Sequence, residues 1–112
     1  MGDTVLIVDD HEAFRGFARR LLEAGGLTVI GEAADGVSAV AAVRELDPDL
    51  VLLDVMLPDI DGFAVAEQIA DRARVVLTSS RDFDDLRERL ARTPARGFIP
   101  KAELSAEALR AI

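Results

Sequence analysis

The sequence predicts an α/β fold in which five parallel strands form one doubly wound sheet with helices on both faces. Short apolar runs rich in β-branched residues alternate with segments whose apolar residues repeat every three or four positions. The apolar runs are almost uninterrupted, as expected of strands that helices cover on both sides. The chain has 112 residues, about the length of one domain, and half of them are hydrophobic, which is enough for a real core.

Five runs are interpreted as the strands of this sheet. They are residues 4–8, 27–31, 50–53, 75–77 and 97–99. Strands that alternate with helices belong to parallel sheets, because each parallel connection must cross over a face of the sheet. We therefore expect a (βα)₅ chain.

Apolar stripes with helical spacing follow each predicted strand. They are, in chain order, Phe14, Phe17, Ala18 and Leu21; Ala39, Val43 and Leu46; Ala66, Ile69, Ala70 and Ala73; Phe83, Leu86 and Leu90; and Leu104, Ala108, Ala111 and Ile112. Gly25 and Gly26 end the first helix, Pro48 the second and Pro94 the fourth. The fifth stripe reaches the last residue without a capping glycine, so we expect a shortened fifth helix and a single domain over residues 1–112, taken from a longer protein.

Composition excludes several classes of protein. The 21 acidic residues outnumber the 13 basic ones, and Trp and Tyr are absent, so a surface that contacts nucleic acid is not expected in this chain. The absence of cysteine rules out disulfides and thiolate metal sites and agrees with a cytoplasmic location. The apolar runs are far shorter than the roughly 20 residues that a membrane-spanning helix needs.

Polar side chains follow four of the five predicted strands. They are Asp9 and Asp10 after the first, Asp54 after the third, Thr78, Ser79 and Ser80 after the fourth, and Lys101 after the fifth. Ligands of open parallel sheets bind beyond the carboxyl ends of the strands, so these side chains are expected to share one rim. Each alone could be a helix cap or a surface charge. The second strand leads into a turn in which Asp35 is expected to cap the next helix.

Carboxylates, hydroxyls and one lysine at a shared rim indicate phosphoryl chemistry. Three neighbouring carboxylates repel one another, and one pKa should rise unless a cation lies among them. Oxygen ligands of this kind suit Mg²⁺, which typically binds one or two carboxylates together with phosphate oxygens. An aspartate can act as a nucleophile and form an aspartyl phosphate, which a metal ion, a lysine and a hydroxyl then stabilise.

Four motifs in order resemble the receiver domain of two-component response regulators over nearly the whole chain. They are VLIVDDHEAFR, DLVLLDVMLPDIDGF, VVLTSS and GFIPKAEL. The words DDH and KAEL are most similar to the NarL-type subfamily. The resemblance implies a flavodoxin-like, CheY-like fold with strand order 2-1-3-4-5.

The resemblance also implies a role for each acidic residue. Asp54 corresponds to the phospho-acceptor and is also a metal ligand. Asp10 corresponds to the direct Mg²⁺ ligand, with Asp9 acting largely through water, and the backbone carbonyl of Met56 completes the protein ligands.

Further roles are implied around the phospho-acceptor. Thr78 corresponds to the switch hydroxyl, Lys101 to the ion-pairing lysine and Phe98 to the switch aromatic. Met56 and Ser80 flank the site and are expected to tune the lifetime of the phosphoryl group.

The function implied is that of a bacterial signalling domain in a phosphorelay. A sensor histidine kinase is the expected donor, and the domain is not an enzyme except that it catalyses its own phosphotransfer and autodephosphorylation. Phosphorylation is expected to change the face formed by the fourth helix, fifth strand and fifth helix, and so to control transcription. Contact with DNA is expected only through a C-terminal helix-turn-helix that this sequence lacks. No membrane contact is expected, and a homodimer is left open.

Three features depart from the resemblance or stand outside it. Ala102 follows Lys101 where many receivers have a proline and a cis bond, so this loop is expected to have a different shape. The short stretch between residues 54 and 78 predicts a third helix with fewer turns. His11 is interpreted as a residue of the first helical turn and not as a metal ligand, because Mg²⁺ prefers oxygen.

Other functions on related chemistry or the same fold are weaker interpretations. A pseudo-receiver would bind partners without phosphorylation, but it would be expected to lack some of the acidic or lysine positions. A hydrolase of the haloacid dehalogenase type needs an acid two residues after its nucleophile, where this chain has Met56. A flavodoxin needs a phosphate-binding loop after the first strand and Trp or Tyr residues for its flavin, and this sequence has neither.

Overall fold

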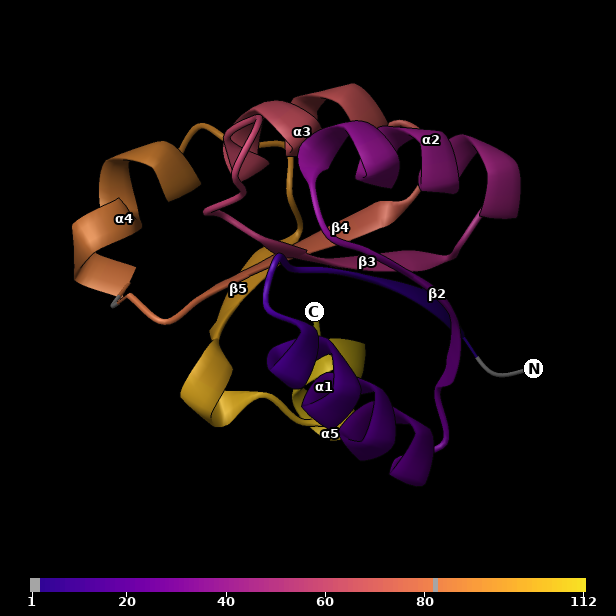
Figure 1. Ribbon diagram of the computed structural model, residues 1–112. Helices are drawn as coiled ribbons and strands as arrows, with labels where there is room; N and C mark the ends of the chain where they lie inside the picture. Colours follow the sequence, from indigo (N-terminus) through magenta and orange to yellow (C-terminus); the bar gives the residue numbers. More distant parts are fainter. Residues whose placement is uncertain (1–2, 82) are drawn as a thin grey trace.

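The computed structural model describes residues 3–81 and 83–112 of the chain, which form five strands and five α-helices around one sheet (Figure 1). The strands are β1 (Thr4–Val8), β2 (Thr28–Ala33), β3 (Leu50–Asp54), β4 (Arg74–Ser79) and β5 (Gly97–Pro100). The helices are α1 (Glu12–Ala24), α2 (Gly36–Leu46), α3 (Gly62–Ile69), α4 (Phe83–Leu90) and α5 (Ala106–Arg110), with a 3₁₀ turn at Lys101–Glu103. The strand order is β2-β1-β3-β4-β5 and every pair is parallel, which confirms the predicted fold class and order.

The two faces of the sheet carry separate hydrophobic cores. In Figure 1, α2 and α3 cover one face, and α1 and α5 cover the other. Leu6 and Val8 of β1 pack into the core under α2 and α3, whereas Val5 and Ile7 pack into the core under α1 and α5. This alternation follows from the two-residue period of a strand. Because both faces are covered, the strands are apolar without interruption, as the sequence predicted.

The central strand β3 positions the candidate site. All five of its residues are buried, and β1 and β4 pair with it on either side. Burying each large aliphatic side chain stabilises the fold by about 1.5–3 kcal/mol. Asp54 is the last residue of β3 and is therefore held at the rim by a strand that has little freedom to move.

The strands extend further into polar sequence than predicted. Asp54 and Thr78 lie within β3 and β4, where they are paired with each other, and Ser79 also belongs to β4. β2 covers Thr28–Ala33 where residues 27–31 were predicted. The reason is that backbone hydrogen bonds define a strand, and these bonds continue past the apolar residues from which the strands were predicted.

Some residues of the predicted helical stripes are exposed or lie beyond the helices. Phe17, in the middle of α1, and Leu46, the last residue of α2, have exposed fractions of 49% and 39%. Ala73 is buried but lies beyond α3, and Ala111 and Ile112 lie beyond α5. The prediction for Phe83 concerns a side chain outside the described residues. Helical spacing locates a stripe well, but it does not show where the helix stops.

The loops around the sheet agree with the predicted turn chemistry. The side chain of Asp35 accepts a hydrogen bond from the Ser38 backbone N–H at 2.7 Å and caps α2, which confirms the predicted cap. Every peptide bond in the described residues is trans, and Lys101 opens the 3₁₀ turn. No helix in this part of the chain combines the length and the apolar character that crossing a membrane requires.

Candidate functional site

Four strands bring the predicted polar side chains to one rim of the sheet. Asp9 and Asp10 follow β1, Asp54 ends β3, Ser80 follows β4, and Lys101 follows β5. One ligand atom from each of these three aspartates and one from His11 all lie within 4.8 Å of one another. The sequence prediction placed the three carboxylates together correctly, and the ammonium of Lys101 lies among them.

A shallow cavity of about 280 Å³ opens above this group. Titratable side chains of the site and the residues beside them line this cavity. They are Asp10, His11, Asp54, Met56, Leu57, Pro58, Ser79, Ser80 and Lys101. The cavity gives solutes access to the phospho-acceptor candidate, although that residue is only 3% exposed. Ser80 and Met56, which were predicted to flank the site, both line the opening.

Lys101, the only lysine in the sequence, is the cationic partner of the buried carboxylates. Its Nζ lies 2.7 Å from Oδ2 of Asp9 and 3.2 Å from Oδ2 of Asp54. The side chains of Asp9 and Asp54 are 0% and 5% exposed, so this ion pair forms largely away from water. A lysine in this position offsets the repulsion between two buried negative charges.

The two buried carboxylates have opposite pKa shifts. Burial raises the pKa of Asp54, and the negative charge of Asp9 adds to this, more than the Met56 N–H and Lys101 lower it. For Asp9, burial also acts upward, but Lys101 and the His11 backbone N–H together hold its pKa below the ordinary value. The pKa of Lys101 is raised, because its two anionic partners outweigh the effect of burial.

Asp54 is oriented by contacts to both of its oxygens. Oδ1 accepts a hydrogen bond from the Met56 backbone N–H at 3.0 Å, and Oδ2 faces Lys101. The side chain of Met56 is 57% exposed and extends into solvent beside the cavity. The loop after β3 therefore fixes the carboxylate from one side and the lysine fixes it from the other.

Thr78 lies on β4 and Phe98 on β5, the two strands that follow β3 in the sheet. Thr78 pairs with Asp54 in the parallel ladder, and its hydroxyl donates to the Ile99 carbonyl oxygen at 2.7 Å. That bond connects β4 to β5. Phe98 of β5 is half-buried against the core under α2 and α3 and lines an apolar groove with α4. Strand pairing and this hydrogen bond thus link β3 to β4 and β5, and α4 packs against β5.

The acidic side chains are oxygen donors of the kind that suits Mg²⁺. Asp10 is exposed to the cavity, whereas Asp9 is buried, and its Oδ1 accepts a hydrogen bond from the His11 backbone N–H at 2.8 Å. His11 is the residue before α1, and its ring Nδ1 lies 3.1 Å from a carboxylate oxygen of each aspartate. The donor set fits a hard dication, which the carboxylates of Asp9, Asp10 and Asp54 could hold.

Two supporting residues were missed by the sequence reasoning. The ring of Phe14 lies against Lys101, with its centroid 4.4 Å from Nζ. Arg15 donates to the backbone carbonyl of Asp9 at 2.7 Å and to Glu32 at 3.0 Å. Phe14 and Arg15 are part of the motif DDHEAFR, but the helical pattern only placed Phe14 in an apolar stripe and gave Arg15 no role.

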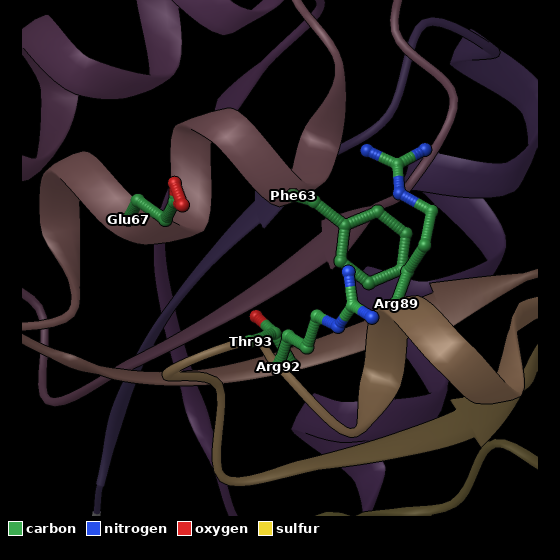
Figure 2. Close-up of a pocket in the computed structure, with 5 residues that line it drawn as sticks. All are labelled: Phe63, Glu67, Arg89, Arg92 and Thr93. Atoms are coloured by element: carbon green, nitrogen blue, oxygen red, sulfur yellow. The ribbon is translucent and has the colours of Figure 1, made fainter.

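A separate cavity of about 190 Å³ lies between α3 and α4 (Figure 2). Phe63, Glu67, Arg89, Arg92 and Thr93 line it. The guanidinium of Arg89 lies over the Phe63 ring, 4.2 Å from its centroid, and also pairs with Asp61 at 2.6 Å. These contacts join α4 to the start of α3. None of these lining residues lines the acidic cavity, so the chemistry belongs to the rim of the sheet.

Comparisons with known proteins identify the family. The family model of the response regulator receiver domain matches residues 5–112, so the chain belongs to this family. The response regulator GacA of Pseudomonas viridiflava is 36% identical over 112 residues, which cover 96% of this chain and 52% of GacA. The chain spans about half the length of the curated relatives it matches.

Solved structures agree with this assignment. The signal receiver domain of a NarL response regulator from Mycobacterium tuberculosis has a TM-score of 0.87 and 32% identity, over 98% of this chain and 92% of that one. A chain of a CheX–CheY–BeF₃–Mg²⁺ complex from Borrelia burgdorferi has a TM-score of 0.83 and 29% identity, over 96% and 84%. The similarity to NarL agrees with the subfamily that the sequence motifs indicated.

Proposed function

We propose that this receiver domain accepts a phosphoryl group on Asp54 from a sensor histidine kinase and acts as a switch. The observation that carries the proposal is the convergence of Asp9, Asp10 and Asp54 around Lys101 at the carboxyl ends of the strands. Receiver domains are signalling domains that partner with histidine kinases and bind Mg²⁺ at an acidic pocket. Catalysis of phosphotransfer by the domain itself, and its autodephosphorylation, are parts of this proposal.

In the proposed reaction a carboxylate oxygen of Asp54 attacks the phosphorus of a phosphohistidine. The P–O bond forms as the P–N bond breaks, and the electron pair of the broken bond returns to the imidazole nitrogen. Asp9, Asp10, Asp54 and the backbone carbonyl of Met56 would hold Mg²⁺, which would supply positive charge beside the transferring oxygens. Because the Asp54 side chain is already oriented by its neighbours, little ordering is needed before attack.

The new phosphoryl group is expected to move the switch residues. It adds negative charge beside Lys101, which can pair with phosphoryl oxygens, and it offers an acceptor to the hydroxyl of Thr78. For that hydroxyl to turn toward Asp54, its bond to Ile99 must break. Phe98, next to Ile99 in β5, can then repack, and the surface of α4, β5 and α5 changes. Couplings of this kind are typically about 1–3 kcal/mol, so they shift an existing equilibrium.

The output is proposed to be transcriptional. The curated relatives are about twice as long as this chain and include regulators of transcription. On this basis the 112 residues act as the receiver of a longer regulator, whose DNA-binding part would lie outside them. Self-association through the α4–β5–α5 face, or through α1 and α5, would couple the two parts.

Intact mass spectrometry after incubation with acetyl phosphate tests the proposal. We expect a gain of one phosphoryl group that requires Mg²⁺ and is absent in Asp54→Ala. If the wild-type domain gains no phosphoryl group, the proposal fails, and the alternative of a pseudo-receiver that binds a partner without phosphorylation takes its place.

A further inference from the structure

The carboxylate of Asp59 joins the loop after β3 to the start of α2. Its Oδ1 accepts hydrogen bonds from the backbone N–H of Gly36 at 2.7 Å and of Ile60 at 2.8 Å, and its Oδ2 accepts one from Val37 at 3.0 Å. Gly36 and Val37 are the first two residues of α2, 23 and 22 positions earlier in the chain. The loop therefore supplies acceptors to a helix with which it is not continuous.

Asp59 completes the N-terminal cap of α2. The first four N–H groups of a helix have no partner within the helix. The side chain of Asp35 accepts from the Ser38 N–H, and the Ala39 N–H makes the first bond within the helix, to the Asp35 backbone carbonyl at 3.0 Å. Asp59 accepts from the unpaired N–H groups of Gly36 and Val37, and its backbone hydrogen bonds hold its pKa below the ordinary value. The negative carboxylate also lies at the positive end of the helix dipole.

Close packing at Gly36 supports the same contact. A Cβ atom at this position would lie 2.9 Å from Cβ of Ile60 and 2.9 Å from Cγ2 of Val65. Only glycine allows the helix, the loop and α3 to approach this closely. The contact between Asp59 and α2 is thus part of a packed junction.

The same loop carries the groups that face the phospho-acceptor. Met56 lies three residues before Asp59, and its N–H donates to Asp54. The ends of the loop are fixed by the bond of the Val55 N–H to Thr78 and that of the Gly62 N–H to Val55, each 3.0 Å long. Between these ends, the bonds of Asp59 hold the loop against α2.

We propose that Asp59 is a positioning residue, which fixes the loop so that the carbonyl of Met56 is oriented for Mg²⁺ beside Asp54. This inference rests on the proposed function. A loop that is ordered before the metal binds loses less conformational freedom on binding, and the affinity rises accordingly. A freed loop would have to be ordered each time Mg²⁺ binds.

Isothermal titration of Mg²⁺ alone into the metal-free domain tests this role, with Asp35→Ala as the matched control. Asp35→Ala and Asp59→Ala each remove one carboxylate and one part of the same helix cap, so both should lower the thermal midpoint. We expect Asp59→Ala to weaken Mg²⁺ binding about tenfold, which corresponds to about 1.4 kcal/mol, and Asp35→Ala to leave it within about twofold. Asp59→Asn keeps an oxygen for Gly36 and Ile60 and should restore most of the affinity.

Three results would overturn the inference. Asp59→Ala could bind Mg²⁺ as well as the wild type, Asp35→Ala could weaken binding equally, or Asp59→Asn could behave like Asp59→Ala, which would indicate a charge effect. Asp59→Ser, whose side chain is too short to span the contact, serves as a second variant if Asp59→Ala does not fold. A wild-type domain that binds no Mg²⁺ would instead defeat the proposed function itself, and this inference with it.

Discussion

The ammonium of Lys101 lies closer to Asp9 than to the proposed phospho-acceptor, at 2.7 Å from Asp9 Oδ2 and 3.2 Å from Asp54 Oδ2. Asp9 therefore stays ionised, while the Asp54 carboxylate is buried with less compensation. This difference in distance indicates different roles for Asp9 and Asp54. Asp9 is a fixed negative charge, and Asp54 is the carboxylate whose environment improves when a dication arrives.

Replacing Lys101 by Met should destabilise the domain by about 3 kcal/mol at pH 7, because two buried carboxylates lose their cation while the aliphatic stem is kept. The pKa of Lys101 is raised by folding, so its stabilising effect is fully present below the unfolded pKa and is lost as pH rises through the folded pKa. Urea unfolding at pH 7 measures the loss. The exposed Arg72→Ala should change stability by less than about 0.5 kcal/mol, and an equal loss in both variants would contradict the prediction.

Replacing Asp54 by Asn should stabilise the metal-free domain at pH 7 by about 1 kcal/mol, the usual scale of a single-site effect. The pKa of Asp54 is raised by folding, so ionised Asp54 destabilises the fold once pH exceeds the folded pKa, and this cost disappears below the unfolded pKa. Thermal unfolding of both proteins across pH measures it. A variant that is less stable than the wild type at pH 7 would show that the carboxylate is fully compensated.

Addition of Mg²⁺ should raise the thermal midpoint of the wild-type domain more than that of Asp54→Asn. An ion bound at the proposed site would stabilise the folded state and relieve the repulsion between Asp54 and Asp9, whereas the variant would lack one anionic ligand. Thermal scans over a series of Mg²⁺ concentrations provide the comparison, with Ca²⁺ as a second dication. Equal shifts in the two proteins would mean that the ion binds without Asp54.

Replacing Thr78 by Val should cost about 1–3 kcal/mol of stability, because the Ile99 carbonyl loses its hydroxyl donor in a buried position. Thr78→Ser keeps the donor and should lose much less. The two variants also separate roles in the switch, since only Ser can still donate to a phosphoryl oxygen. Urea unfolding and the lifetime of the phosphorylated form measure the two effects, and a switch that is unimpaired in Thr78→Val would remove this residue from the mechanism.

Met56→Asn should change the rate at which the phosphoryl group is hydrolysed. The exposed apolar side chain lines the cavity above Asp54 and cannot position water by hydrogen bonding, whereas an amide can. Decay of the phosphorylated mass over time gives the rate, with Ser80→Ala as a second flanking variant. If neither substitution changes the decay, these positions do not tune the lifetime.

The sequence predicted the sheet and the residues that gather at its rim, because both follow from patterns of neighbouring residues along the chain. Apolar runs and helical stripes placed every strand and helix, and the carboxyl ends of the strands placed Asp9, Asp10, Asp54 and Lys101 at one rim. The alternation of strands and helices predicts the parallel direction of the strands, whereas their order was implied by the resemblance to receiver domains.

The details that the sequence left open depend on contacts between distant residues. Nothing local to Asp59 shows that it caps a helix 23 positions earlier, and nothing local to Thr78 shows that its hydroxyl bonds to Ile99. The spacing of Phe14 placed it in an apolar helical stripe, but it did not show that its ring lies against Lys101. Such roles appear only when the fold brings separate elements together.

The most direct test of the central claim is to locate the phosphoryl group by borohydride trapping. Borohydride reduces an aspartyl phosphate to homoserine, so peptide mapping after treatment with acetyl phosphate and Mg²⁺ identifies the modified residue. We expect homoserine at position 54 only, and none when Mg²⁺ is omitted. Homoserine at position 9 or 10, or at no position, would contradict the assignment of Asp54 as the phospho-acceptor.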